Sequence, residues 1–78
     1  MQTETLKKAF MEALGIDESK DIENLEYNTI DEWDSVAHMN LIGEIEDAFD
    51  IMLDTDDIID MSSFSKAQEI VSKYLADA

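Results

Sequence analysis

The chain has 78 residues and is strongly acidic: 20 aspartates and glutamates face 5 lysines and no arginine, for a formal net charge of -15. Phosphate groups are bound by clustered Lys and Arg, so this composition disfavours nucleic acid and anionic membranes as partners and favours basic protein surfaces. A chain of this length forms one modest core without the internal cleft that most enzymes need. We therefore expect a single domain over residues 1–78 that is not an enzyme.

Covalent cross-links cannot stabilise this fold. There is no cysteine, so a disulfide framework and a thiolate metal site are both excluded, and packed helices must supply the stability. The first residues, Met-Gln-Thr-Glu-Thr, lack a basic segment followed by an apolar run, and no apolar stretch approaches membrane-spanning length. We expect no signal peptide, no membrane partner and a cytoplasmic location.

The first predicted helix covers residues 3–14. Its apolar residues fall on one face, at the three-and-four spacing of an amphipathic helix: Leu6, Phe10, Ala13 and Leu14. Gly15 follows the last periodic position, where helices commonly end in a left-handed residue. The helix is therefore predicted to stop at Gly15.

Residues 16–34 form a long connection whose apolar residues show no sustained helical period: Ile16, Ile22, Leu25, Tyr27, Ile30 and Trp33. Connections of this length are usually functional or disordered. So many large apolar side chains imply packing against the helices, and we expect an ordered loop. The polar residues Asp17, Glu18, Ser19 and Asp21 could support a short turn of helix near its start.

The second predicted helix covers residues 35–50 and has a wide apolar stripe: Val36, Met39, Leu41, Ile42, Ile45, Ala48 and Phe49. A stripe this broad is expected of a helix that lies centrally in a bundle and contacts several neighbours. Gly43 lies inside this helix, where glycine costs about 1 kcal/mol relative to alanine. It indicates either the close approach of another element or a tolerated defect.

The last third of the chain predicts a short helix over residues 54–61 and a longer one from near Ser63 to the C-terminus. The stretch Asp54-Thr55-Asp56-Asp57 is rich in residues that cap helix N-termini. A capping box over residues 65–68 would start the longer helix slightly later. The apolar face of that helix consists of Phe64, Ala67, Ile70, Val71, Tyr74 and Leu75. The predicted fold class is an all-α four-helix bundle with three longer helices, a short third helix and a long ordered loop between the first two.

Two acidic clusters invite comparison with a calcium-binding loop, but the ligand spacing fails in both. If Asp54 is the first ligand, Ile59 takes the position of the turn glycine and Ser65 that of the bidentate glutamate. A start at Asp17 fails in the same way, with Ile22 at the glycine position. We predict no specific metal site and expect only weak cation binding.

The single histidine, His38, comes three residues after Ser35 and shares its helical face. A Ser-His nucleophile would also need an orienting group, an oxyanion site and a substrate cavity. A bundle of this size offers little room for them, so no catalytic residue is predicted. We interpret His38 as an exposed or rim side chain that could contact a partner.

Ser35 stands where the ordered connection becomes a helix, directly after Trp33 and Asp34. Serine is among the commonest helix caps, and capping is the simplest interpretation of this residue. An exposed hydroxyl at a helix entrance has a second use. A phosphate attached to it would lie near free backbone N–H groups and the positive end of the helix dipole.

The whole pattern resembles the acyl carrier protein family, whose members attach a 4′-phosphopantetheine arm to the serine of an Asp-Ser-Leu motif at the start of their second helix. The motif is matched by Asp34-Ser35-Val36, and the helix behind it ends Ile-Glu-Asp-Ala-Phe-Asp at residues 45–50. Residues 54–61 match the short third helix, and Tyr74-Leu75 match the end of the last one. The resemblance covers essentially the whole chain.

The resemblance implies a monomeric carrier in which Ser35, with Asp34 beside it, holds an arm supplied by coenzyme A and carries acyl or aminoacyl groups as thioesters. The implied partners are a phosphopantetheinyl transferase and the loading and transferring enzymes, which present basic patches. The implied partner-binding residues are Val36, Asn40, Glu44, Glu46, Asp47 and Asp50. The implied lining of a gap for the acyl chain is Val36, Met39, Ile58, Ile59 and Met61.

Several residues depart from the usual fatty-acid-synthesis pattern of that family. Val36 stands in place of leucine and Ala37 where an acid is common. Asn40 stands where a glutamate is expected, and Trp33 where a small residue often precedes the motif. These departures favour a dedicated carrier in a specialised pathway, such as polyketide, nonribosomal peptide or surface-glycan and lipid modification. The alternatives are a housekeeping fatty-acid-synthesis carrier and an unmodified acidic helical adaptor that binds a basic partner protein.

Overall fold

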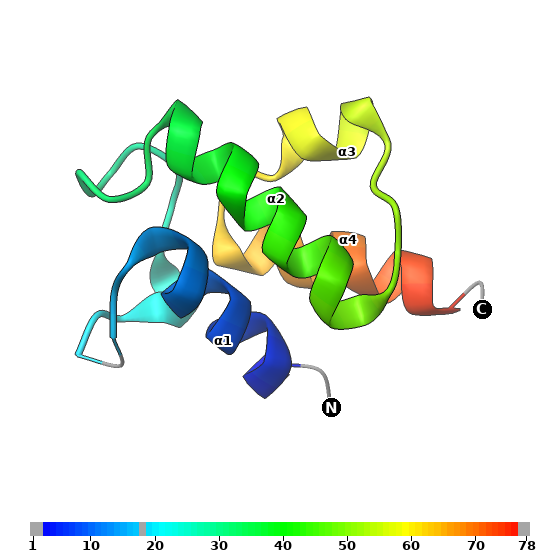
Figure 1. Cartoon of the computed structure of the whole chain (residues 1–78), viewed down its shortest axis with the longest axis horizontal. Helices are drawn as coiled ribbons and strands as arrows, with labels where there is room; N and C mark the ends of the chain where they lie inside the picture. Colours follow the sequence, from blue (N-terminus) through cyan, green and yellow to red (C-terminus); the bar gives the residue numbers. More distant parts are fainter. Residues whose placement is uncertain (1–2, 18, 77–78) are drawn as a thin grey trace.

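The computed structural model describes residues 3–17 and 19–76, and within these ranges the chain is all-α (Figure 1). Its four α-helices are α1 (Thr3–Leu14), α2 (Ser35–Phe49), α3 (Thr55–Asp60) and α4 (Phe64–Ala76). A short 3-10 helix, η1 (Ile22–Asn24), interrupts the connection between α1 and α2. None of the helices in these ranges is long and apolar enough to cross a membrane. The predicted helical positions are confirmed, with small shifts at the ends.

The ends of α1 and α2 are both closed by a left-handed residue. Gly15 follows α1 with φ 67°, as predicted. Asp50, predicted to lie inside the second helix, is instead its C-cap with φ 54°, so α2 ends at Phe49. An aspartate accepts this conformation more readily than most residues, because its short side chain is tolerated in the left-handed region.

The helical turn in the connection lies later than predicted. Asp17 accepts hydrogen bonds from both the backbone N–H and the hydroxyl of Ser19, and this local turn competes with a helix. The 3-10 turn begins only at Ile22, after Asp21 as its N-cap. Glu18, part of the same prediction, lies outside the described residues.

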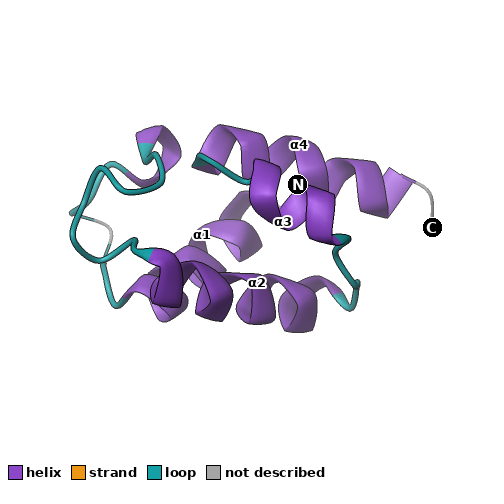
Figure 2. Ribbon diagram, turned by 90° about the horizontal axis from the view of Figure 1, so that it is seen from above, coloured by secondary structure: helices purple, strands orange, loops and turns teal. Residues whose placement is uncertain are grey.

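The core is built around α1, α2 and α4: Figure 1 shows α1 and α3 on opposite sides of α2, and Figure 2 shows α4 across from α2. Phe10, Trp33 and Phe64 are completely buried. Phe10 packs edge-on against Trp33 at 5.3 Å between ring centroids and against Phe64 at 4.9 Å. These three rings join α1, the long connection and α4 into one aromatic cluster, and such pairs add stability beyond their buried area.

The long connection is ordered, as predicted, because it is tied to the start of α4. The Tyr27 N–H donates to the Ser62 carbonyl at 2.8 Å, and the Phe64 N–H donates to the Leu25 carbonyl at 3.0 Å. Leu25 and Trp33 are also buried in the core. The backbone and the side chains thus hold the connection against the same part of the fold.

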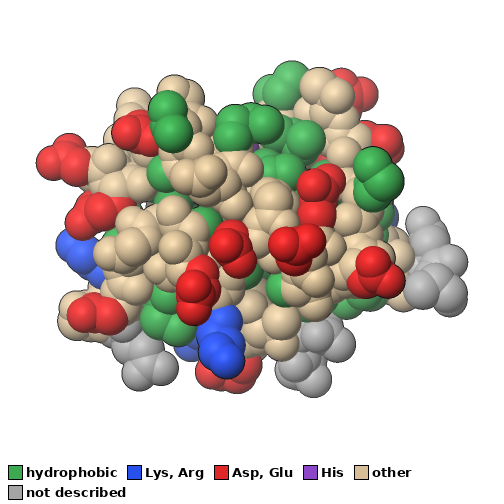
Figure 3. All heavy atoms as spheres, in the orientation of Figure 1, with side chains coloured by type: hydrophobic (Ala, Val, Ile, Leu, Met, Phe, Trp, Pro, Cys, Tyr) green, Lys and Arg blue, Asp and Glu red, His purple; other side chains and the backbone are tan. Residues whose placement is uncertain are grey.

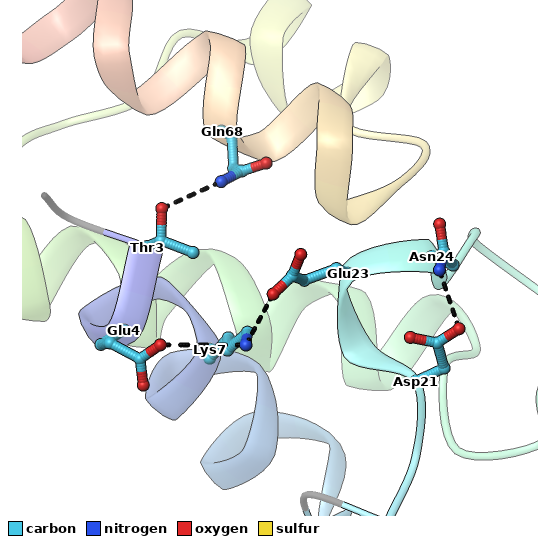
Figure 4. Close-up of polar contacts among 7 residues, drawn as sticks. All are labelled: Thr3, Glu4, Lys7, Asp21, Glu23, Asn24 and Gln68. Atoms are coloured by element: carbon cyan, nitrogen blue, oxygen red, sulfur yellow. Dashed lines mark hydrogen bonds and ion pairs between the residues drawn. The ribbon is translucent and has the colours of Figure 1, made fainter.

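Further polar contacts attach α1 to its neighbours (Figure 4). Lys7 forms an ion pair with Glu23 of η1 at 2.7 Å. The Gln68 amide donates to the Thr3 hydroxyl at 3.1 Å, so α4 is fixed to the start of α1. Gln68 is therefore not used in a capping box.

The start of α4 follows the first of the two alternatives considered for it. The Ser63 hydroxyl accepts from the Lys66 N–H at 3.0 Å, so Ser63 caps the helix and Phe64 begins it. Phe64 is completely buried, which explains why the helix includes it.

The apolar stripe of α2 is narrower in the structure than in the prediction. Leu41, Ile42 and Ile45 are buried, whereas Ala48 is exposed and Val36 and Met39 are 72% and 59% exposed. The stripe was predicted to contact several neighbours, and Val36, Met39 and Ala48 are the positions where it stays largely exposed. An apolar surface remains there because no described element covers it.

Gly43 is exposed in the middle of α2. A Cβ atom built at this position would meet nothing within 4 Å. No other element of the described chain approaches it closely, so of the two earlier alternatives only the tolerated defect fits the isolated chain.

Candidate functional site

Ser35 is the first residue of α2, and Asp34, not Ser35, is the N-cap. The Asp34 carboxylate accepts from the Ala37 N–H at 2.9 Å, and its carbonyl accepts from the His38 N–H at 2.8 Å. The interpretation of Ser35 as a cap is wrong, because the extended backbone of Asp34 places that carboxylate over the first turn. Ser35 is exposed and its hydroxyl has no capping role.

The position of Ser35 suits an attached anion. Within an α-helix the first N–H groups have no acceptor, and here those of Ser35 and Val36 lie at the positive end of the α2 dipole. An anionic group bonded to the Ser35 oxygen would lie beside them.

An apolar cavity of about 360 Å³ opens beside Ser35, between α2 and α3. Four of the five predicted lining residues contribute to it: Met39, Ile58, Ile59 and Met61. Val36 does not line it, and its side chain is 72% exposed. The sequence did not reveal three further lining residues, Tyr27, His38 and Ser62. Hydrophobic side chains gather on the molecule's surface where α2 and α3 face each other, at the top of Figure 3.

His38 is hydrogen-bonded through both ring nitrogens. The Trp33 indole N–H donates to Nδ1 at 3.0 Å, and Nε2 lies 2.9 Å from the Ile58 carbonyl oxygen. An indole nitrogen only donates, so Nδ1 accepts and Nε2 carries the proton: the imidazole is neutral. We call this Trp33–His38–Ile58 chain of hydrogen bonds the His38 bridge.

His38 was predicted to be exposed or at the rim, and it lies at the rim of the cavity with both ring nitrogens hydrogen-bonded. Its side chain is half-buried and joins the long connection to α3 through α2. Its ring also stacks on Trp33 at an interplanar angle of 18° and meets the edge of Tyr27 at 5.3 Å. Both nitrogens are occupied, so neither is available to Ser35. No periodic pattern signals these partners, because they come from three different segments.

The short helix α3 has no fully buried residue; its half-buried Ile58 packs against the core, and polar contacts hold the helix on two sides. On one side the His38 bridge reaches the Ile58 carbonyl. On the other, the Tyr74 hydroxyl donates to Asp57 at 2.6 Å and the Lys73 ammonium lies 2.9 Å from the same carboxylate. The Tyr74 hydrogen bond and then Lys73 lower the pKa of Asp57, and the Asp57 carboxylate in turn raises the pKa of Tyr74.

The predicted partner-binding residues are placed mainly on the exposed surface of α2. Asn40, Glu44 and Asp47 are exposed and line a groove of about 510 Å³ that also touches α1. Acidic side chains are spread across this face of the molecule in Figure 3. Glu46 differs, because it is half-buried and its carboxylate accepts from the Leu53 N–H at 2.9 Å. Its contact fixes the segment that leads to α3.

The described residues contain no group of three or more histidines, aspartates and glutamates that could hold a metal ion. No protein-family model, curated protein sequence or solved structure matches this chain. The chemistry of the site therefore rests on its own residues: a free hydroxyl at a helix N-terminus, an apolar cavity beside it and an acidic surface around it.

Proposed function

We propose that this chain is a carrier protein that bears a 4′-phosphopantetheine arm on Ser35, and that its helices form the single four-helix-bundle domain of such carriers. The observation that supports this most directly is the exposed Ser35 hydroxyl at the first turn of α2, opening onto an apolar cavity. When attached, the arm supplies a thiol that holds acyl or aminoacyl groups as thioesters.

The division of roles between Asp34 and Ser35 supports this proposal. Asp34 caps α2, so modification of Ser35 would not cost the helix its cap. The phosphodiester formed on the Ser35 oxygen would face the unpaired N–H groups of the first turn, which stabilise negative charge. The fold therefore gains a favourable contact on modification and loses none.

The acidic surface supports docking to basic enzymes. Glu44, Asp47 and Asp50 are exposed along and just beyond the second half of α2, where they would attract Lys- and Arg-rich patches. Electrostatic steering of this kind accelerates association and weakens as salt rises. A carrier that visits several enzymes in turn benefits from fast, reversible contacts.

The uncharged residues Val36, Ala37 and Asn40 make the first half of α2 less acidic than the second. We assign the carrier to a specialised biosynthetic pathway on this ground, with the housekeeping fatty-acid-synthesis role as the alternative. An unmodified acidic adaptor is the rival of a different class, since the charged surface of α2 could bind a basic partner without Ser35 or the cavity.

One experiment tests the carrier function. The protein is incubated with coenzyme A, magnesium and a broad-specificity phosphopantetheinyl transferase, and its intact mass is measured. We expect the mass gain of one arm in the wild type and none in Ser35→Ala. Ser62→Ala is the matched control, because Ser62 is an exposed serine lining the same cavity and its loss should leave the gain unchanged. An unmodified wild type, or equal modification of Ser35→Ala, would reject the proposal in favour of the adaptor.

A further inference from the structure

The inner wall of the cavity beside Ser35 is made of polar and aromatic groups that are fixed in place. His38 lines the cavity, and directly behind it lies Trp33, which is completely buried. Trp33 is in turn packed against Phe10 at 5.3 Å, and Phe10 against Phe64 at 4.9 Å. Rings therefore lie between the His38 side of the cavity and the core, while the buried Met61 lines the cavity directly.

The His38 bridge also limits how far α2 and α3 can separate. Moving α3 away from α2 breaks the hydrogen bond from His38 Nε2 to the Ile58 carbonyl. On its far side α3 is held by Tyr74 and Lys73 through Asp57, so it cannot simply shift outwards with its contacts intact. Displacing His38 instead would leave the buried Trp33 N–H without its acceptor.

The outer part of the cavity is open and adaptable. Met39 and Ile59 are 59% and 73% exposed, and both line the mouth. Apolar cargo can bury surface against them and against Met61 without moving a helix, and a flexible methionine adapts to its shape. Further methylene groups would have to enter past His38 or extend out of the cavity towards solvent.

From this geometry we infer that the cavity takes short or compact acyl groups, and that the His38 bridge with Trp33 behind it excludes the inner part of a long alkyl chain. This inference rests on the proposed function, because it treats Ser35 as the point from which the cargo enters. It names the class of cargo that the carrier protects: acyl groups with a small apolar part.

The chain contains no cysteine, so Ser35→Cys creates a single attachment point that needs no transferase. Butyl, octyl and tetradecyl methanethiosulfonates would each be reacted with this variant. The introduced thiolate attacks the sulfenyl sulfur, a disulfide forms and methanesulfinate leaves. Two quantities are then measured for each adduct: the thermal midpoint, and the fluorescence of Trp33, which is the only tryptophan.

With His38 intact, we expect the midpoint to rise from the butyl to the octyl adduct and to rise no further for tetradecyl, with constant Trp33 emission. With His38→Ala added, the tetradecyl adduct should gain further stability over octyl and the emission should change. His38→Gln, which keeps an acceptor and a donor, is the control if His38→Ala folds poorly, and it should show an intermediate profile.

Three results would overturn the inference. The midpoint could continue to rise through tetradecyl with His38 intact, it could be the same for all three adducts, or the profile could be unaffected by both His38 variants. These readouts do not depend on coenzyme A. Failure of the proposed function would appear separately, as an unmodified mass with the transferase, so the two failures are distinguishable.

Discussion

Replacing His38 by leucine should destabilise the protein mainly through the group it leaves behind. Trp33 is completely buried, and its indole N–H has its acceptor in His38 Nδ1 at 3.0 Å. A buried donor without a partner costs about 1–3 kcal/mol. The hydrogen bond from Nε2 to the Ile58 carbonyl adds about 0.5–1.5 kcal/mol. The two terms are not strictly additive, so we expect a loss of about 1–4 kcal/mol in the free energy of unfolding.

A double-mutant cycle with Trp33→Phe isolates the contribution of the indole N–H. Phenylalanine keeps an aromatic ring in the cluster with Phe10 but has no N–H to satisfy. In that background His38→Leu should cost only the contact with Ile58, and the coupling between the two sites should be about 1–2 kcal/mol. Removing both partners of a buried hydrogen bond is less costly than removing one.

The free energies should be measured by urea unfolding followed by far-ultraviolet circular dichroism, since Trp33→Phe removes the fluorescent reporter. All four proteins must be compared at the same pH and salt, and a constant slope with urea would show that the unfolding transitions are comparable. If His38→Leu costs the same with Trp33 and with phenylalanine at that position, the hydrogen bond is not what couples them and the reasoning about the His38 bridge fails.

Two other changes test separate parts of the fold. Gly43→Ala should raise the free energy of unfolding by about 1 kcal/mol in urea unfolding, because residue 43 is inside α2 and a Cβ there meets nothing within 4 Å. Asp57→Asn should lower the thermal midpoint at neutral pH, because Tyr74 and then Lys73 hold the pKa of Asp57 below its ordinary 3.8. Because the pKa of Asp57 is lowered, its ionised form stabilises the fold above pH 3.8. This contribution is lost as the pH falls through the folded-state pKa. The difference in thermal midpoint between Asp57→Asn and wild type should therefore close at acid pH.

Each of these two predictions has a matched control variant. Gly15→Ala should destabilise the protein, because that residue has φ 67° and an alanine is strained there. Asp56→Asn removes the same charge from an exposed position of α3 and should show little of the pH-dependent gap. A stabilising Gly15→Ala, or a gap for Asp57→Asn that persists unchanged at acid pH, would contradict the explanation in each case.

The sequence was sufficient for the helices because helix formation is governed by neighbours along the chain. Period, glycine and capping residues give α1 with its end at Gly15, the short α3 and the capping of α4 by Ser63. The choice of cap for α2 was not decided by residue type, since Asp34 and Ser35 are both good caps. The backbone conformation of the long connection decided it.

The residues of the candidate site likewise divide into those predicted from the sequence and those revealed only by the structure. Its proposed attachment point and most of its apolar lining were predicted from the sequence: Ser35, Met39, Ile58, Ile59 and Met61. The inner wall of the cavity was not predicted. Tyr27 and Ser62 lie in connections that carry no periodic signal, and only the folding of these connections brings them to the cavity. The resemblance to acyl carrier proteins implied Val36 as a lining residue, but the structure leaves it out of the cavity.

By itself the sequence determined an acidic all-α chain with a serine at the entrance of its second helix, since charge, helical period and capping are properties of residues and their neighbours. The tertiary structure alone decided that Ser35 is free because Asp34 caps the helix, and that His38 is neutral and bonded on both sides. It brought Trp33, His38 and Ile58 together from three segments. Hydrogen bonds between such distant groups depend on how the segments pack, which no local pattern records.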